Sequence, residues 1–281
     1  MILRFWGTRG SIPSPGFGTA KYGGNTTCLE LILNDGTFII FDAGTGIRKL
    51  GDSIIQHRKN GAIHLFLTHS HWDHIQGFPF FLPAYSDNVQ IKIFGCPLAF
   101  NKLKEILSSQ MESSYFPVNF NQLKANIAFH EVQQFEQWVK NARFSFIRNN
   151  HPGAAYGFRV NEADKMIVFI TDNELLPSDK PVNTSWDEFV EFCRNADILV
   201  HDAQYLQDEM IETTGFGHSS YEQVFRLGLE ANVKHLIFFH HEPDRSDDEI
   251  EMILEKFRKE RDNLKISMKL DAATEGLSYT I

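Results

Sequence analysis

The chain has 281 residues, of which 42% are hydrophobic, and its formal net charge is −9. This length and composition indicate a folded protein of one large domain or two ordinary ones, with a sizeable core. The acidic balance argues against the broad basic face that nucleic-acid binding normally uses, so we expect nucleic acid to be a disfavoured partner.

The cysteine and hydrophobic content gives further bounds. Cys28, Cys96 and Cys193 are scattered and form no CxxC pair or disulfide framework, which predicts buried thiols and a cytoplasmic location. No apolar stretch is long enough to span a membrane, and the chain opens on a strand-like run instead of a signal peptide. The 25 phenylalanines predict an aromatic core or pocket wall.

The first half of the chain predicts short strands joined by glycine-rich turns, and then alternating strands and helices. A hairpin turn is expected at the Asn-Asp-Gly of 34–36. The aromatic, proline-rich run 76–86 predicts a pocket-lining loop with a short helix. The expected strands are 2–5, 26–33, 37–41, 63–67 and 89–94, and the expected helices begin near Ile47 and cover 98–109.

The second half repeats this pattern. Its expected strands are 144–148, 156–160, 166–170, 198–200 and 235–239, and its expected helices are 186–194, 220–231 and 247–258. Four strands are followed by a ligand-type residue: His69, Asp172, Asp202 or His240. The pattern predicts an α/β protein that is a single domain over 1–281, with two pseudo-symmetric halves of about 1–140 and 141–281. If these strand ends meet at one edge of a sheet, they would assemble a site from residues that are far apart in the sequence.

The densest cluster of ligand-type residues directly follows the strand 63–67. Three histidines and one aspartate stand within six consecutive residues: His69, His71, Asp73 and His74. Imidazole nitrogens and carboxylate oxygens are the usual ligands of Zn²⁺ and similar metals. The spacing indicates half of a two-metal site.

Later residues would complete such a site. His69, His71 and His151 would hold one metal, Asp73, His74 and His240 the second, and Asp172 would bridge them at about 3.5–4 Å. Three alternatives stay open. His151 also fits an ordinary His-Pro-Gly loop, Asp172 could cap a following helix, and His241 competes with the favoured His240.

These motifs together resemble the metallo-β-lactamase superfamily, whose fold is a four-layer αββα sandwich. The sequence His69-x-His71-x-Asp73-His74 matches its signature, and His151, Asp172 and His240 follow in the same order as the later ligands. Asp42-Ala43-Gly44 matches the Asp-x-Gly turn before the signature. We expect Asp42 to fix the turn or support a ligand.

The closer resemblance is to the phosphodiesterase branch, which includes tRNase Z, phosphoribosyl cyclic phosphodiesterase and certain cyclic-nucleotide phosphodiesterases. Trp6-Gly7-Thr8 resembles its opening, His201-Asp202-Ala203 its His-Glu-Ala segment, and Gly217-His218-Ser219 its Gly-His-Ser segment. The resemblance implies that His218 is catalytic and that Asp202 orients it. The alternative for His218 is a loop histidine. Asp202 stands where the branch often has Glu, which shortens the reach to His218.

The resemblance implies a metal-dependent hydrolase of phosphodiesters that acts through a hydroxide bridging two divalent metals, with zinc favoured over manganese or iron. Asp73 is counted among the catalytic residues as well as the ligands. The favoured substrate is a small phosphodiester, such as a cyclic nucleotide or cyclic phosphate. The branch's long basic arm has no counterpart over 100–140, where four lysines are balanced by four glutamates. A homodimer is implied by analogy.

Other functions stay open at this point. An RNA 3′-end endonuclease of the tRNase Z type and a non-catalytic metal sensor are the main alternatives, and an acyl hydrolase is a weaker one. The aromatic loop 78–85, like Tyr115 and Phe116, could stack a nucleobase or could pack over the core.

Overall fold

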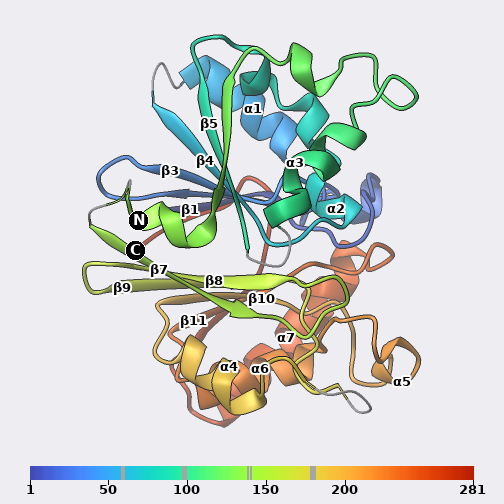
Figure 1. The fold of residues 1–281 in the computed structure, drawn as a ribbon. Helices are drawn as coiled ribbons and strands as arrows, with labels where there is room; N and C mark the ends of the chain where they lie inside the picture. Colours follow the sequence, from blue (N-terminus) through green and yellow to red (C-terminus); the bar gives the residue numbers. More distant parts are fainter. Residues whose placement is uncertain (58–60, 97–99, 138, 140, 178–181) are drawn as a thin grey trace. The chain divides into compact units, whose positions relative to one another are not determined.

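The computed structural model describes residues 1–57, 61–96, 100–137, 139, 141–177 and 182–281. The chain forms two compact units (Figure 1). The first unit comprises Met1–Pro13, Asn25–Lys140 and Glu275–Thr280, and the second comprises Ser14–Gly24, Asn141–Thr274 and Ile281. The main division falls at residue 140. The segments 14–24 and 275–280 each belong to the unit of the other half, which local sequence patterns do not indicate.

The first unit is built on a seven-stranded sheet in the order β13-β1-β2-β3-β4-β5-β6. Its strands are β1 (Ile2–Gly7), β2 (Cys28–Ile32), β3 (Phe38–Phe41), β4 (Ala62–Leu67), β5 (Gln90–Gly95), β6 (Asn126–Glu131) and β13 (Ser278–Thr280). Its helices are α1 (Ile47–His57), α2 (Trp72–Ile75) and α3 (Phe100–Ser109), with the 3₁₀ turns η2 (Phe78–Phe80), η3 (Leu82–Tyr85), η4 (Phe120–Gln122) and η5 (Val132–Gln137). Strands β3 to β6 run parallel, so their carboxyl ends meet at one edge.

The two faces of this sheet bury different side chains, because strand residues alternate in direction. On one face Ile40 and Leu65 pack with Leu50 of α1 and Leu103 of α3. The other face carries an aromatic cluster. Phe66 stacks on Phe94 with ring centroids 4.6 Å apart, and Phe135 contacts both rings edge-on. The many phenylalanines thus serve this core, as predicted.

The second unit is built on a six-stranded sheet in the order β12-β11-β10-β9-β8-β7. Its strands are β7 (Ala142–Arg148), β8 (Tyr156–Glu162), β9 (Lys165–Ile170), β10 (Ile198–Asp202), β11 (His235–Phe239) and β12 (Lys269–Ala272). Its helices are α4 (Trp186–Cys193), α5 (Met210–Thr213), α6 (Tyr221–Glu230) and α7 (Asp247–Asn263), with the 3₁₀ turn η1 (Phe17–Thr19). Strands β9 to β12 are parallel.

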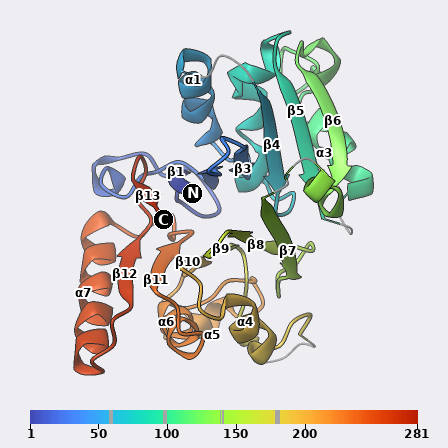
Figure 2. The ribbon, with the colours of Figure 1, turned by 90° about the vertical axis from the view of Figure 1, so that its left-hand side faces the viewer.

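Helices α4, α6 and α7 cover one face of this second sheet with a continuous apolar core. Leu199 and Phe238 of the sheet pack in the same cluster as Phe189, Tyr221 and Phe257 of the helices. Figure 2 shows α7 running alongside β12. The helices begin at serines whose side chains close capping boxes, at Ser185, Ser220 and Ser246.

The predicted strands and helices are present, with boundary differences of a few residues. Asp202 lies inside β10 and not after it. Residues 98 and 99 of the predicted helix 98–109 lie outside the described residues. Strands β6, β12 and β13 were not predicted. Strands β12 and β13 are short, and β13 is defined by its pairing with the distant β1.

All three cysteines are buried free thiols, as predicted, and burial raises the pKa of each. Within the described ranges, every helix is too short or too polar to cross a membrane.

Replacing Ser246 with Ala should lower the free energy of unfolding by about 1 kcal/mol, because the serine caps the longest helix of the described chain. Its Oγ accepts the N–H of Glu249 and donates to the Glu249 carboxylate. Chemical denaturation would measure the change. Ser109→Ala, on an exposed serine at the end of α3, is the control and should change stability by less than about 0.5 kcal/mol. Equal effects of the two changes would contradict the capping role.

Candidate metal centre

The first unit gathers four ligand-type residues where the chain leaves β4 and enters α2. The ring centroids of His69 and His71 lie 4.5 Å apart, and those of His69 and His74 lie 4.2 Å apart. Nε2 of His74 is 3.1 Å from Oδ2 of Asp73, which also accepts the backbone N–H of Ser11 at 2.9 Å. The whole signature therefore forms one compact cluster, here called the first cluster.

Asp42 holds this cluster from the end of the neighbouring strand β3. Its carboxylate accepts the backbone N–H and the hydroxyl of Thr68, both at 2.8 Å, and lies 2.8 Å from Nδ1 of His74. Burial raises the pKa of Asp42, and His74 opposes that rise. Asp42 thus fixes the turn at Thr68 and holds the ring of His74.

The second unit brings its ligand-type residues to the carboxyl edge of its parallel strands. Asp172 follows β9, Asp202 ends β10 and His240 follows β11. His151, from the loop between β7 and β8, has its Nε2 3.8 Å from Oδ2 of Asp172. Nε2 of His240 is 3.2 Å from Oδ1 of the same aspartate. We call His151, Asp172 and His240 the second cluster.

The two oxygens of Asp172 therefore face two different histidines. A carboxylate that bridges two cations must offer one oxygen to each of them. The orientation of Asp172 between His151 and His240 has this form. No helix forms over the described residues 173–177, so Asp172 does not cap one directly after it.

Hydrogen bonds at Nδ1 set which imidazole nitrogen can act as a ligand. In His74, His151 and His240 this atom faces the Asp42 carboxylate, the Gly217 carbonyl and the Gln204 amide oxygen, respectively. Nδ1 of His69 faces Thr68 Oγ1, whose proton is already donated to Asp42. Because each partner accepts, Nδ1 carries the proton and Nε2 keeps its lone pair. The donor set therefore fits divalent metals such as zinc.

His218 and Asp202 form a dyad beside the second cluster. Nδ1 of His218 lies 2.7 Å from Oδ2 of Asp202, so the shorter aspartate reaches the histidine. The His218 ring stacks on His240 with centroids 5.0 Å and planes 16° apart. Backbone N–H groups of Asn173 and Gln204 donate to the buried Asp202 carboxylate at 3.2 and 3.1 Å. These bonds fix the orientation of the Asp202 carboxylate beside His218.

Asn173, which the sequence analysis did not single out, connects the loops of the second unit. Its side-chain oxygen accepts the N–H of Asn150, next to His151, at 2.9 Å. Its carbonyl accepts the hydroxyl of Ser219, next to His218, at 2.5 Å. Its amide nitrogen lies 3.3 Å from Nε2 of His201, whose pKa is lowered by burial. The only sequence signal for this role is its place directly after Asp172.

The two adjacent histidines after β11 point to different surroundings. His240 joins Asp172 and Gln204, whereas Nε2 of His241 lies 2.9 Å from the Ala273 carbonyl and its ring contacts Tyr22 edge-on. The geometry supports His240 as the ligand.

The aromatic loop 78–85 is largely packed into the core. Phe78 and Phe81 are fully buried, whereas Phe80 is 52% exposed and contacts Phe116 edge-on. Tyr115 is also exposed. Packing therefore accounts for Phe78 and Phe81, and only the exposed rings are free to stack on a ligand.

At position 217, only glycine fits against His151. It has φ +91°, and a Cβ placed on it would lie 2.2 Å from Nδ1 of His151. A side chain there would displace the imidazole as well as strain the backbone.

Gly217→Ala should therefore lower metal content by about one equivalent, because displaced His151 can no longer present Nε2. Elemental analysis of the purified variant would measure this. Gly36→Ala, with a φ of +84° and open space around its Cβ, strains the backbone alone and should keep the full metal content. If both variants kept it, His151 would not be a ligand.

Comparisons with known proteins show which family the chain belongs to. The profile of the β-lactamase superfamily domain matches residues 37–241. A ribonuclease Z of Picrophilus torridus is 26% identical over 293 aligned positions, which cover 87% of each chain. Two crystal structures share the fold. Human short-form tRNase Z has a TM-score of 0.67 at 21% identity and covers 100% of this chain and 99% of its own. A diphosphatase from the PhnP family has a TM-score of 0.66 at 18% identity, and the match covers 100% of this chain and 97% of that protein. The chain has the metallo-β-lactamase fold of a metal-dependent hydrolase and belongs to the β-lactamase superfamily domain family.

Proposed function

We propose that the protein is a metal-dependent phosphodiesterase. The observation that carries this is the His218–Asp202 dyad stacked against His240, beside an aspartate that faces two histidines. An acyl hydrolase would not require such a dyad. The relatives named ribonuclease Z support the same class of reaction.

The proposed ligands are those of the two clusters. His69, His71 and His151 would hold one divalent cation, Asp73, His74 and His240 would hold the second, and Asp172 would bridge them. The support is the chemistry of each cluster, in which imidazoles present Nε2 and carboxylates stand beside them. Zinc suits this set best, and manganese and iron also accept it. When bound, the cations would stabilise phosphoryl charge and lower the pKa of water to about 7.

The dyad handles the proton of the leaving group in this proposal. Asp202 holds Nδ1–H of His218, so the protonated ring can donate from Nε2 to a phosphoryl or leaving oxygen. The negative carboxylate also stabilises the imidazolium form. The backbone donors from Asn173 and Gln204 keep Asp202 in place while His218 changes its protonation state.

The relatives named ribonuclease Z favour RNA as the substrate, and the RNA 3′-end endonuclease is therefore the first candidate. This stands against the expectation from net charge that nucleic acid is disfavoured. The charge argument concerns the whole surface, whereas cations in the clusters would dominate the local field that a phosphate meets. Cleavage of RNA would therefore not require a basic chain.

A small phosphodiester is the second candidate. The observation that favours it is the segment 100–140, where four lysines and four glutamates cancel. This segment supplies no net positive charge to grip a long polyanion. The structural neighbour from the PhnP family is a diphosphatase.

Replacing His218 with Ala should lower kcat about 10²–10⁴-fold on a phosphodiester whose leaving group is an alkoxide, such as a cyclic nucleotide, the usual contribution of general acid–base catalysis. Asp202→Asn should also lower kcat, because an amide that donates to Nδ1 of His218 would hold the imidazole in the wrong tautomer. Metal content measured on the same samples should be unchanged, since neither residue is a proposed ligand. Loss of metal in His218→Ala would instead make His218 a ligand, and unchanged kcat would remove it from the mechanism.

A substrate screen with metal-reconstituted protein would separate the candidates. We expect cleavage of a tRNA precursor at its 3′ side, with a rate that falls steeply as salt rises from 50 to 200 mM, as phosphate contacts require. Cleavage restricted to cyclic nucleotides and linear dinucleotides would select the small-substrate candidate. Absence of hydrolysis on every substrate, across zinc, manganese and iron, would favour a metal sensor.

A further inference from the structure

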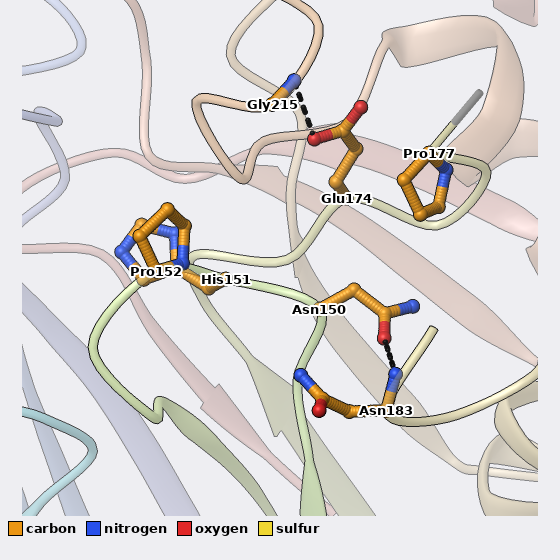
Figure 3. Close-up of a pocket in the computed structure, with 7 residues that line it drawn as sticks. All are labelled: Asn150, His151, Pro152, Glu174, Pro177, Asn183 and Gly215. Carbon is orange, nitrogen blue, oxygen red and sulfur yellow. Dashed lines mark hydrogen bonds between the residues drawn. The ribbon is translucent and has the colours of Figure 1, made fainter. Parts of the chain in front are cut away.

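The two histidines of the second cluster have different surroundings. His151 lies on the wall of a pocket of about 240 Å³, which Figure 3 shows in the second unit. His240 is fully buried, its ring stacks on His218, and its Nε2 faces Asp172. Because His240 is enclosed by protein, the groups around it set the direction of its ring.

The partner at Nδ1 of His240 is an amide, whereas His74 and His218 each have a carboxylate at this atom. Oε1 of Gln204 lies 3.0 Å from Nδ1 of His240. One end of a glutamine amide accepts hydrogen bonds and the other end donates them. If the amide turned over, its N–H would face Nδ1 and would favour the tautomer with the proton on Nε2. That tautomer has no lone pair on Nε2 for a metal.

Glu242 determines which end of this amide faces His240. Nε2 of Gln204 donates to Oε2 of Glu242, and the Tyr205 hydroxyl lies 3.4 Å from the same nitrogen. A carboxylate can only accept, so a turned amide would set Oε1 of Gln204 against another acceptor. Gln204 is 2% exposed, and an acceptor left facing an acceptor in a buried place is costly.

The backbone around Glu242 is fixed by a second contact between the same two loops. Gln204 follows β10 and Glu242 follows β11, and these strands are parallel neighbours. Farther along the two loops, the Arg245 guanidinium lies 2.6 Å from the Glu209 carboxylate. The backbone N–H of Arg245 also donates to the Glu242 carbonyl at 3.0 Å. The position of Glu242 beside Gln204 is therefore built into the fold.

We propose that Glu242 is a positioning residue of the metal centre and that it acts on His240 through Gln204. The carboxylate orients the amide, and the amide oxygen holds Nδ1–H of the imidazole. The proposal rests on His240 as a metal ligand, as assigned under the proposed function, and does not depend on which phosphodiester is the substrate. Glu242 and Gln204 contact neither cation nor substrate in this scheme, so their effect is on how tightly the metal is held.

The test measures the zinc affinity of the metal-free protein by competition with a chromophoric chelator, which gives a dissociation constant for each of the two equivalents. Gln204→Met keeps the length of the side chain and removes the acceptor. It should weaken one equivalent about 10–100-fold, the usual effect of losing the partner of a histidine ligand. Glu242→Ala should weaken the same equivalent about ten-fold, the lower end of that range, because the amide oxygen stays beside Nδ1 but is no longer held there.

The double variant distinguishes action through Gln204 from two independent effects. If Glu242 acts through Gln204, adding Glu242→Ala to Gln204→Met should not weaken zinc binding further, whereas independent effects would multiply. Asp244→Ala is the matched control, because it removes one negative charge from an exposed position of the same loop. It should leave both dissociation constants at their wild-type values.

His240→Ala separates failure of this proposal from failure of the metal centre. If His240→Ala binds both equivalents as tightly as the wild type, His240 is not a ligand and the proposed centre fails as well. If it loses one equivalent while Glu242→Ala binds zinc normally, the centre stands and the role of Glu242 is overturned. Glu242 is only partly buried, so this variant should fold. Equal weakening in Glu242→Ala and Asp244→Ala would show a charge effect alone, and multiplied effects in the double variant would exclude the path through Gln204.

Discussion

Hydrogen bonds at Nδ1 orient the imidazoles on which the candidate chemistry depends. Asp42, Gly217 and Gln204 each hold one histidine by this atom, so that its Nε2 faces Asp73 or Asp172. A histidine without such a partner would rotate and exchange tautomers, and its lone pair would be lost from the site for part of the time. His218 makes the same kind of contact with the Asp202 carboxylate, so its ring is oriented in the same way.

The strand ends that carry these residues are conformationally costly. Asp42, Asp172 and His240 have φ values of 62°, 51° and 60°, in the left-handed region that non-glycine residues seldom occupy. Such backbone costs of order 1–3 kcal/mol each and persists only where the surroundings enforce it. In the second unit, the strands paired on either side of β9 and of β11 provide that enforcement. The strained turns redirect each side chain from the sheet face to the sheet edge.

Charge is distributed so that an acidic chain can act on anions. Acidic groups in and beside the clusters are engaged: Asp73 contacts His74 and Ser11, and Asp202 is held by His218 and two backbone donors. Bound cations would therefore outweigh them locally.

The sequence by itself determined those features whose residues are close neighbours in the chain. The residues of the first cluster are neighbours in the chain, so their proximity follows from the end of one strand. The apolar runs before Asp172 and His240 marked buried strands, and these placed both residues at strand ends. The capping serines at 220 and 246 and the turn at 34–36 are equally local, because their hydrogen bonds span four residues or fewer.

Only the tertiary structure decided what depends on distant partners. The direction of Asp172 toward two histidines, the separation of His240 from His241, and the Asn173 hub all rest on contacts between residues 20 or more positions apart. The burial of Phe78 and Phe81 depends likewise on the core beneath them. Residue type limits what each side chain can do, but its direction is fixed by long-range packing and hydrogen bonds, which no local pattern records.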